Sequence, residues 1–128
     1  MIHLDTSVLV DALSGPEGSA PSLRTAIESG ERVLLSAVVL YEWLRGPRRA
    51  VEIAAQEALF PLQEVVGFGP AEARCAAVLY QRAPRPRRRD LDLAIAACAL
   101  THGARLWTLN PGDFEDIADL TLYRPARR

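Results

Sequence analysis

Short apolar runs alternate with helical patterns along nearly the whole chain. The apolar runs, each of a length typical of a buried strand, fall at residues 2–4, 33–35, 62–66 and 105–109, with a further candidate at 120–123. Helical patterns fill the intervals at residues 6–13, 19–29, 37–45, 48–59, 71–82 and 90–102. This alternation is typical of a mainly parallel sheet with helices on both faces. We therefore predict a single three-layer α/β/α domain over residues 1–128, with a central, mainly parallel sheet of four to five short strands.

The composition is that of one soluble globular domain. The 128 residues are 49% hydrophobic and 24% charged, which is enough apolar material for a core and typical of an ordered chain. No apolar run approaches the length of a membrane span. The N-terminus reaches Asp5 without the basic region of a secretory signal. We therefore expect a cytoplasmic protein that has no contact with a membrane.

The basic and sulfur-containing residues exclude several chemistries. All 15 basic residues are arginines, so the chain has no lysine for a P-loop, a Schiff base or an aspartyl-phosphate site. Cys75 and Cys98 are isolated within helical patterns. Neither a disulfide framework nor a zinc site is therefore indicated.

Asp5 follows the first predicted strand directly. Open α/β sheets place their chemistry just outside the carboxyl ends of the strands, and Asp5 lies at such a position. Thr6 and Ser7 come next and can cap the following helix. The remaining question is which other groups the fold brings to Asp5.

Glu42 lies in a predicted helix that is apolar nearly all round. Such a helix is buried, and a buried carboxylate is costly unless it is paired or bound to a cation. One interpretation is a structural ion pair with a nearby arginine such as Arg45. The other is a metal ligand.

Asp90 and Asp92 open the Ala-rich helix of residues 90–102. Asp90 fits a helix cap better, whereas Asp92 shares its face with the buried Ile95. Because every face of this helix is apolar, helical phase alone does not decide which acid has a function. Asp113 follows an Asn-Pro-Gly turn and is by itself an ordinary turn residue, but it lies just past a strand end, as Asp5 does.

These acids have a common chemistry if the fold brings them together. Converging carboxylates repel one another unless a cation neutralises them. An all-oxygen set of ligands suits Mg²⁺ or Mn²⁺. Such a site serves phosphodiester hydrolysis by metal-activated water.

Four stretches in order resemble the PIN-domain family, and within it the VapC-type toxins of bacterial toxin–antitoxin pairs. They are residues 4–9, 35–46, 92–97 with 102–104, and 106–114. Each stretch alone is a weak signal, but the four together span nearly the whole chain. The resemblance implies a PIN fold and a Mg²⁺- or Mn²⁺-dependent endoribonuclease that leaves a 5′-phosphate and a 3′-hydroxyl. It also implies a homodimer and a VapB-like antitoxin whose C-terminal segment covers the active-site groove.

The resemblance also assigns roles to particular residues. The family's third acid stands three residues before an Ile-Ala pair, which is Asp92 here, so Asp90 becomes a helix cap or a group behind the ligands. Thr6 and Thr108 resemble hydroxyls that orient the acids or a water, and Asn110 occupies a place where relatives carry Asn or Asp. The acids that the resemblance implies as catalytic and metal-binding are Asp5, Glu42, Asp92 and Asp113.

A basic loop precedes the Asp92 helix. Because arginine binds phosphate in a bidentate manner, this loop is a candidate to hold an RNA backbone. A solvated basic loop or an antitoxin contact is an equally good interpretation. The RNA-binding candidates are Arg85, Arg87, Arg88 and Arg89.

Two rival functions remain. A phosphatase of the haloacid-dehalogenase type also places an Asp after its first strand, but it needs a second Asp where this chain has Ser7. Its lysine is absent too, although an arginine can take that place. A PIN fold kept as a catalytically weak RNA-binding or interaction module would be favoured by the loss of one or more acids, yet all four are present. We therefore predict a metal-dependent endoribonuclease, with the binding module as the alternative.

Overall fold

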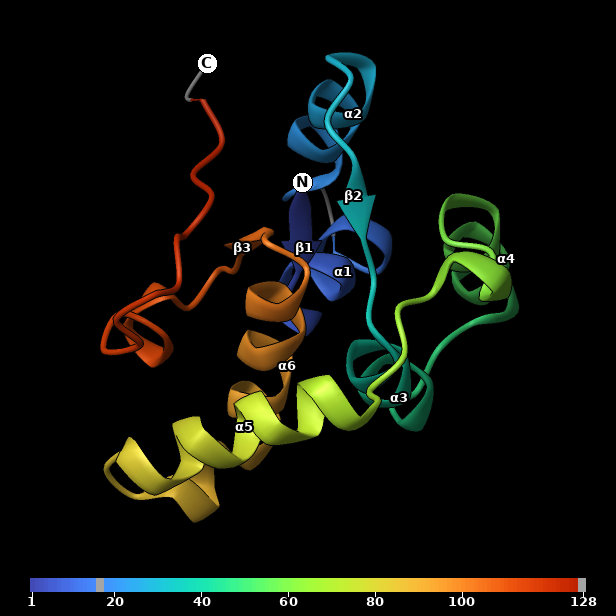
Figure 1. Cartoon of the computed structure of the whole chain (residues 1–128). Coiled ribbons are helices and arrows are strands. Elements are labelled where there is room, and N and C mark those ends of the chain that lie inside the picture. Colours follow the sequence, from blue (N-terminus) through green and yellow to red (C-terminus); the bar gives the residue numbers. More distant parts are fainter. Residues whose placement is uncertain (16–17, 127–128) are drawn as a thin grey trace.

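The computed structural model describes residues 1–15 and 18–126 of the chain. Strands and helices alternate as the apolar pattern predicts, and short 3₁₀ turns separate some of them (Figure 1). In chain order the elements are β1 (Ile2–Leu4), α1 (Thr6–Leu13), α2 (Ala20–Glu28), β2 (Val33–Leu34), α3 (Ala37–Arg45), α4 (Ala50–Leu59), η1 (Leu62–Glu64), α5 (Pro70–Arg82), η2 (Pro86–Arg89), α6 (Asp90–Thr101), β3 (Arg105–Trp107) and η3 (Pro111–Asp113).

The sheet has three parallel strands in the order β2-β1-β3, where the sequence predicted four to five. The other two apolar runs join it only through single parallel bridges, which pair Ser36 with Val66 and Leu106 with Leu122. The run at 62–66 is shortened because Leu62–Glu64 forms a 3₁₀ turn after Pro61, so only its end is extended. The α/β class is therefore confirmed and the number of strands is corrected.

The connections between the strands place helices on both faces of the sheet. Strand β1 is central, with β2 on one side and β3 on the other. The connection from β1 to β2 therefore crosses the sheet in the opposite direction to the connection from β2 to β3. Because such crossovers are right-handed, their helices cover opposite faces. Helix α1 packs against α2, whereas α6 packs against α5 and contacts both β1 and β3. Helix α3 contacts both α1 and α6, below the carboxyl end of the strands in Figure 1.

Helix α6 is apolar on all sides, and the structure explains this pattern because the helix is covered by the strands on one side and by α5 on the other. Small residues such as Ala96 and Ala99 are fully buried and permit a close approach to the strands, while α5 covers the outer side. Trp43, Trp107 and Phe114 are the largest fully buried side chains of the core. No described helix is both long and apolar enough to cross a membrane.

The carboxyl ends of β1 and β3 meet at one edge of the sheet. The backbone N–H of Asp5 donates to the carbonyl of Trp107 at 2.9 Å, so Asp5 and Thr108 leave neighbouring strands side by side. This edge is where the sequence predicts the chemistry.

Candidate active site

Asp5 is a buried carboxylate with one oxygen fixed and one left open. Only 5% of the residue is exposed. Its Oδ2 accepts hydrogen bonds from Ser7 Oγ and from Thr108 Oγ1, both at 2.7 Å. These two donors fix the orientation of the carboxylate. No residue that the structure describes donates to Oδ1, which leaves that atom for a ligand.

The two hydroxyls are themselves held by the loop that follows β3. The backbone N–H of Leu109 donates to Ser7 Oγ, and that of Asn110 donates to Thr108 Oγ1, both at 3.0 Å. Sequence reasoning considered Ser7 only as a residue that could cap a helix and missed its contact with Asp5. Its position two residues after the acid was the available signal. Asn110 contributes through its backbone, and its side chain is exposed.

Glu42 reaches the site from α3. Its Oε1 accepts a hydrogen bond from Thr6 Oγ1 at 2.7 Å, and its Oε2 pairs with Arg45 at 3.3 Å. The structural ion pair considered from the sequence is therefore present. Because the Arg45 side chain is 51% exposed, the pair is weak and leaves Glu42 open to a competing cation.

Asp92 lies in the first turn of α6, within electrostatic reach of the other acids. Burial, and after it the negative charges of Asp5, Asp113 and Glu42, raise the pKa of its carboxyl to about 6, while Arg89 opposes this rise. Each of the other three predicted acids is thus near enough to Asp92 to repel its ionised carboxylate. Asp92 accepts no hydrogen bond from the described residues that would offset this repulsion.

Asp113 and Asp90 differ in where the fold places them. Asp113 is exposed in η3, within the electrostatic reach of Asp92. Asp90 is the exposed first residue of α6 and lines a hollow against α5 together with Phe68 and Tyr80. The structure therefore gathers Asp113 with the other acids and turns Asp90 toward α5.

The donor set fits a hard divalent cation. Among the described residues, no three His, Cys, Asp or Glu side chains form a ready-made cage for an ion. Mg²⁺ does not require such a cage, since it is usually held by one or two carboxylates together with waters and substrate phosphates. The open Oδ1 of Asp5 would supply one oxygen ligand, and a cation would relieve the repulsion at Asp92.

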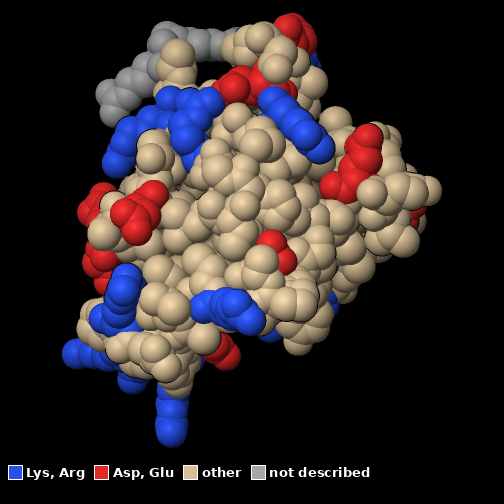
Figure 2. Space-filling view, viewed as in Figure 1, with Lys and Arg blue, Asp and Glu red and all other residues tan. Residues whose placement is uncertain are grey.

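Arginines lie beside this edge. Arg85, Arg88 and Arg89 line an open hollow of ≈ 520 Å³ together with Asp113 and Asp116. Figure 2 shows basic side chains gathered over the end of α5 and the segment that follows it, next to acidic side chains of the η3 loop. Of the four arginines named from the sequence, Arg85, Arg87 and Arg88 are exposed, whereas Arg89 is bonded to Asp116.

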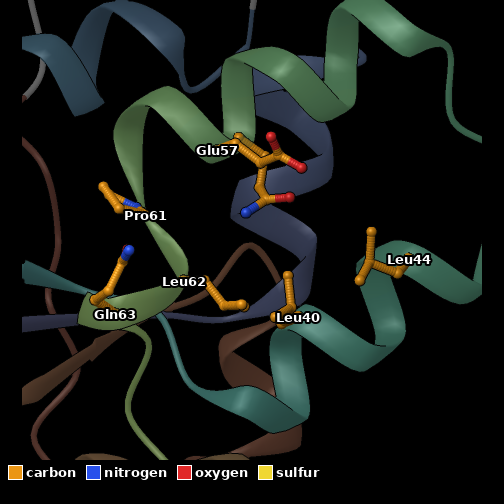
Figure 3. Close-up of a pocket in the computed structure, with 7 residues that line it drawn as sticks. Leu40, Leu44, Glu57, Pro61, Leu62 and Gln63 are labelled. Carbon is orange, nitrogen blue, oxygen red and sulfur yellow. The ribbon is translucent and has the colours of Figure 1, made fainter.

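A second hollow, of ≈ 390 Å³, is apolar and lies between α3, α4 and η1 (Figure 3). Leu40, Leu44 and Leu62 line it, and Leu62 is 75% exposed. None of the four acids contributes to it. An exposed apolar hollow of this kind suits a protein contact better than chemistry on a charged substrate.

We expect Asp92→Asn to stabilise the protein in the presence of a chelator. The pKa of Asp92 in the folded protein, about 6, lies above its ordinary value of 3.8. The ionised carboxylate therefore opposes folding above pH 6. This penalty disappears as the pH falls from 6 to 4 and the group becomes protonated in both states. Since the side chain is only partly buried, we expect the free energy of unfolding to increase by about 1 kcal/mol at pH 7. This corresponds to a rise of about 3 °C in the thermal midpoint.

The matched control is Asp90→Asn, two residues earlier on the same helix, which should not raise the midpoint. Thermal unfolding of the three proteins at pH 7 and pH 4 measures the effect. An Asp92→Asn protein that is no more stable than the wild type at pH 7 would contradict the crowding of the acids.

Comparison with known proteins shows the family of the chain. The PIN domain family model matches residues 2–120. Ribonuclease VapC19 of Mycobacterium tuberculosis is 34% identical over 119 residues, which cover 91% of this chain and 94% of the relative.

Solved structures share the fold. The structure of FitAcB from Neisseria gonorrhoeae has a TM-score of 0.71 at 20% identity and covers 98% of both chains. The structure of VapBC2 from Rickettsia felis, bound to a DNA fragment from their promoter, has a TM-score of 0.66 at 20% identity and covers 96% of this chain and 98% of that chain. The structure of VapBC-1 from nontypeable Haemophilus influenzae has a TM-score of 0.63 at 21% identity. The match covers 96% of this chain and 97% of that chain. Because the PIN domain model matches nearly the whole chain and ribonuclease VapC19 is 34% identical to it, the chain belongs to the PIN-domain family.

Proposed function

We propose that this chain is a Mg²⁺- or Mn²⁺-dependent endoribonuclease, the toxin of a toxin–antitoxin pair. The observation that carries the proposal is the position of Asp92, partly buried at the carboxyl edge of the sheet, where the charges of Asp5, Asp113 and Glu42 add to burial in raising its pKa. A site that keeps such charges together at a cost in stability is typical of one built for a cation. The name of the relative, ribonuclease VapC19, supports RNA as the substrate, and this substrate assigns the activity to the cytoplasm.

The residues divide into ligands and groups that orient them. Asp5 and Asp92 would hold the ion, with Glu42 and Asp113 as the further acids. A bound Mg²⁺ or Mn²⁺ supplies activation of a water and stabilisation of negative charge at the scissile phosphate.

Hydroxyl groups set the direction of two of these acids. Ser7 and Thr108 hold Oδ2 of Asp5 and so direct Oδ1 into the site. Thr6 holds Glu42 in the same way. Such groups behind the ligands commonly contribute 10–100-fold to metal affinity or activity.

The RNA backbone would lie along the basic loop. Arg85, Arg87 and Arg88 are exposed, and two of them line the hollow that also contains Asp113. Arginine pairs with phosphate through two parallel hydrogen bonds. Positive charge beside the acids would hold the strand against an edge that otherwise repels it.

The direct test is cleavage of total cellular RNA by the purified chain in Mg²⁺, in Mn²⁺ and in EDTA. We expect metal-dependent cuts at discrete sites and a loss of at least about 100-fold in Asp5→Asn and Asp92→Asn. Thr108→Val should lose about 10-fold, because it removes one of the two hydrogen bonds that hold Oδ2 of Asp5 without removing a ligand. Glu64→Gln, an exposed acid on η1, is the control and should cleave as the wild type does.

A folded, partner-free wild type that cuts no more than Asp5→Asn in either metal would overturn the nuclease proposal. The chain would then be better described as a PIN-fold RNA-binding or interaction module.

We further propose a VapB-like antitoxin partner and a homodimer. The Rickettsia felis and Haemophilus influenzae structures are of VapBC2 and VapBC-1, and the apolar hollow of Figure 3 offers this chain a contact surface. We expect Asp5→Asn alone to have twice the 14.0 kDa mass of one chain. Co-expression with a candidate VapB-like antitoxin should give a heavier complex by light scattering. A 14.0 kDa species under both conditions would contradict both partners.

A further inference from the structure

Arg89 makes contacts unlike those of the other arginines in its loop. Its neighbours Arg85, Arg87 and Arg88 are exposed, whereas the Arg89 side chain is only 16% exposed. Its Nη1 donates to Asp116 Oδ2 at 2.7 Å and its Nη2 to Asp116 Oδ1 at 2.6 Å. Two parallel bonds of this kind are the strong, geometrically defined form of the arginine–carboxylate pair.

The same guanidinium also binds the backbone of the segment that carries the fourth acid. Nη2 of Arg89 donates to the carbonyl oxygen of Asp113 at 2.9 Å. Arg89 therefore makes three hydrogen bonds to one short loop, residues 113–116. None of them uses the carboxylate of Asp113, which stays available.

These bonds connect the two segments that carry Asp92 and Asp113. Arg89 immediately precedes α6 and stands three residues before Asp92, while Asp116 stands three residues after Asp113. Phe114 is buried in the core and anchors the inner side of the loop. The arginine–carboxylate pair is the polar link between the loop and the start of α6.

The charges support this arrangement. Asp116 and Arg89 stabilise each other's ionised forms, so the pKa of Asp116 is lowered. Arg89 also partly offsets the repulsion that Asp92 experiences from the other acids. A guanidinium with three of its five N–H groups bonded to this loop is less suited than its exposed neighbours to bind an RNA phosphate.

We propose that Arg89 is a positioning residue, which together with Asp116 clamps the 113–116 loop to the start of α6 and so holds Asp113 at a fixed place relative to Asp92. The inference rests on the proposed function, because the purpose of the clamp is to keep two acids in place for one cation. It gives Arg89 a task different from that of Arg85 and Arg88, with which the sequence groups it.

The clamp is tested by Asp116→Asn, Arg89→Ala and the charge-exchanged Arg89→Asp/Asp116→Arg double variant. Three quantities are measured: Mn²⁺ affinity by calorimetry without RNA, kcat and KM for RNA cleavage, and the thermal midpoint in EDTA. We expect both single variants to bind Mn²⁺ about 10-fold more weakly and to lose kcat, with KM unchanged. The double variant should recover most of the Mn²⁺ affinity, because it restores the pair.

The matched control is Glu31→Gln, which breaks the ion pair with Arg105 at the opposite end of the strands. It should leave Mn²⁺ affinity and kcat unchanged. A merely structural role for Arg89 would lower the thermal midpoint and leave Mn²⁺ affinity intact in the protein that remains folded.

Two results would overturn the clamp while leaving the proposed nuclease standing. One is an Asp116→Asn protein that binds Mn²⁺ within about 2-fold of the wild type. The other is a defect confined to KM in Arg89→Ala, which would make Arg89 an RNA ligand. A folded wild type that neither binds Mn²⁺ nor cleaves RNA would overturn the proposed function, and the clamp with it.

Discussion

The rest of the structure has to offset one unfavourable interaction, the repulsion of Asp92 by the other carboxylates. Asp92 is half-buried next to three other acids and, in the described part of the chain, has no hydrogen-bond donor to offset its charge. Such an arrangement opposes folding at neutral pH and persists only because the rest of the molecule holds the acids in place. The cost is local to one edge of the sheet, while the core that offsets it extends through the whole domain.

Each acid is held by a different element, and the elements are held by burial. Helix α6 cannot shift away from the sheet because its apolar faces are covered both by the strands and by α5. Asp5 is fixed by the strand pairing of β1 and β3 and by two hydroxyls. Glu42 is carried by α3, which contacts both α1 and α6 and so connects the two sides of the sheet. The site is therefore a property of the tertiary structure.

Local signals in the sequence predicted much of the fold. Helix α3 has the predicted bounds at both ends, because Ser36 accepts a hydrogen bond from the N–H of Val39 and Gly46-Pro47 ends the helix. The α/β class follows from the alternation of apolar runs and is confirmed. The number of strands was wrong, since an apolar run does not show whether its backbone pairs along its length or at one residue.

Contacts between distant residues could not be predicted in this way. Thr108 binds Asp5 across 103 residues, and Arg89 binds Asp116 across 27. The choice between Asp90 and Asp92 needed the resemblance to the PIN family, because a helix buried on every side has no polar face to mark its functional one. The structure then distinguishes the two, with Asp92 beside the other acids and Asp90 against α5.

A crystal structure of the protein grown with Mn²⁺ and measured for anomalous scattering would locate the cation directly. We expect a manganese peak in contact with Oδ1 of Asp5 and the carboxylate of Asp92, and no such peak in Asp5→Asn crystals grown in the same way. A wild-type map without manganese at this edge of the sheet, or with manganese only at sites that Asp5→Asn retains, would contradict this expectation.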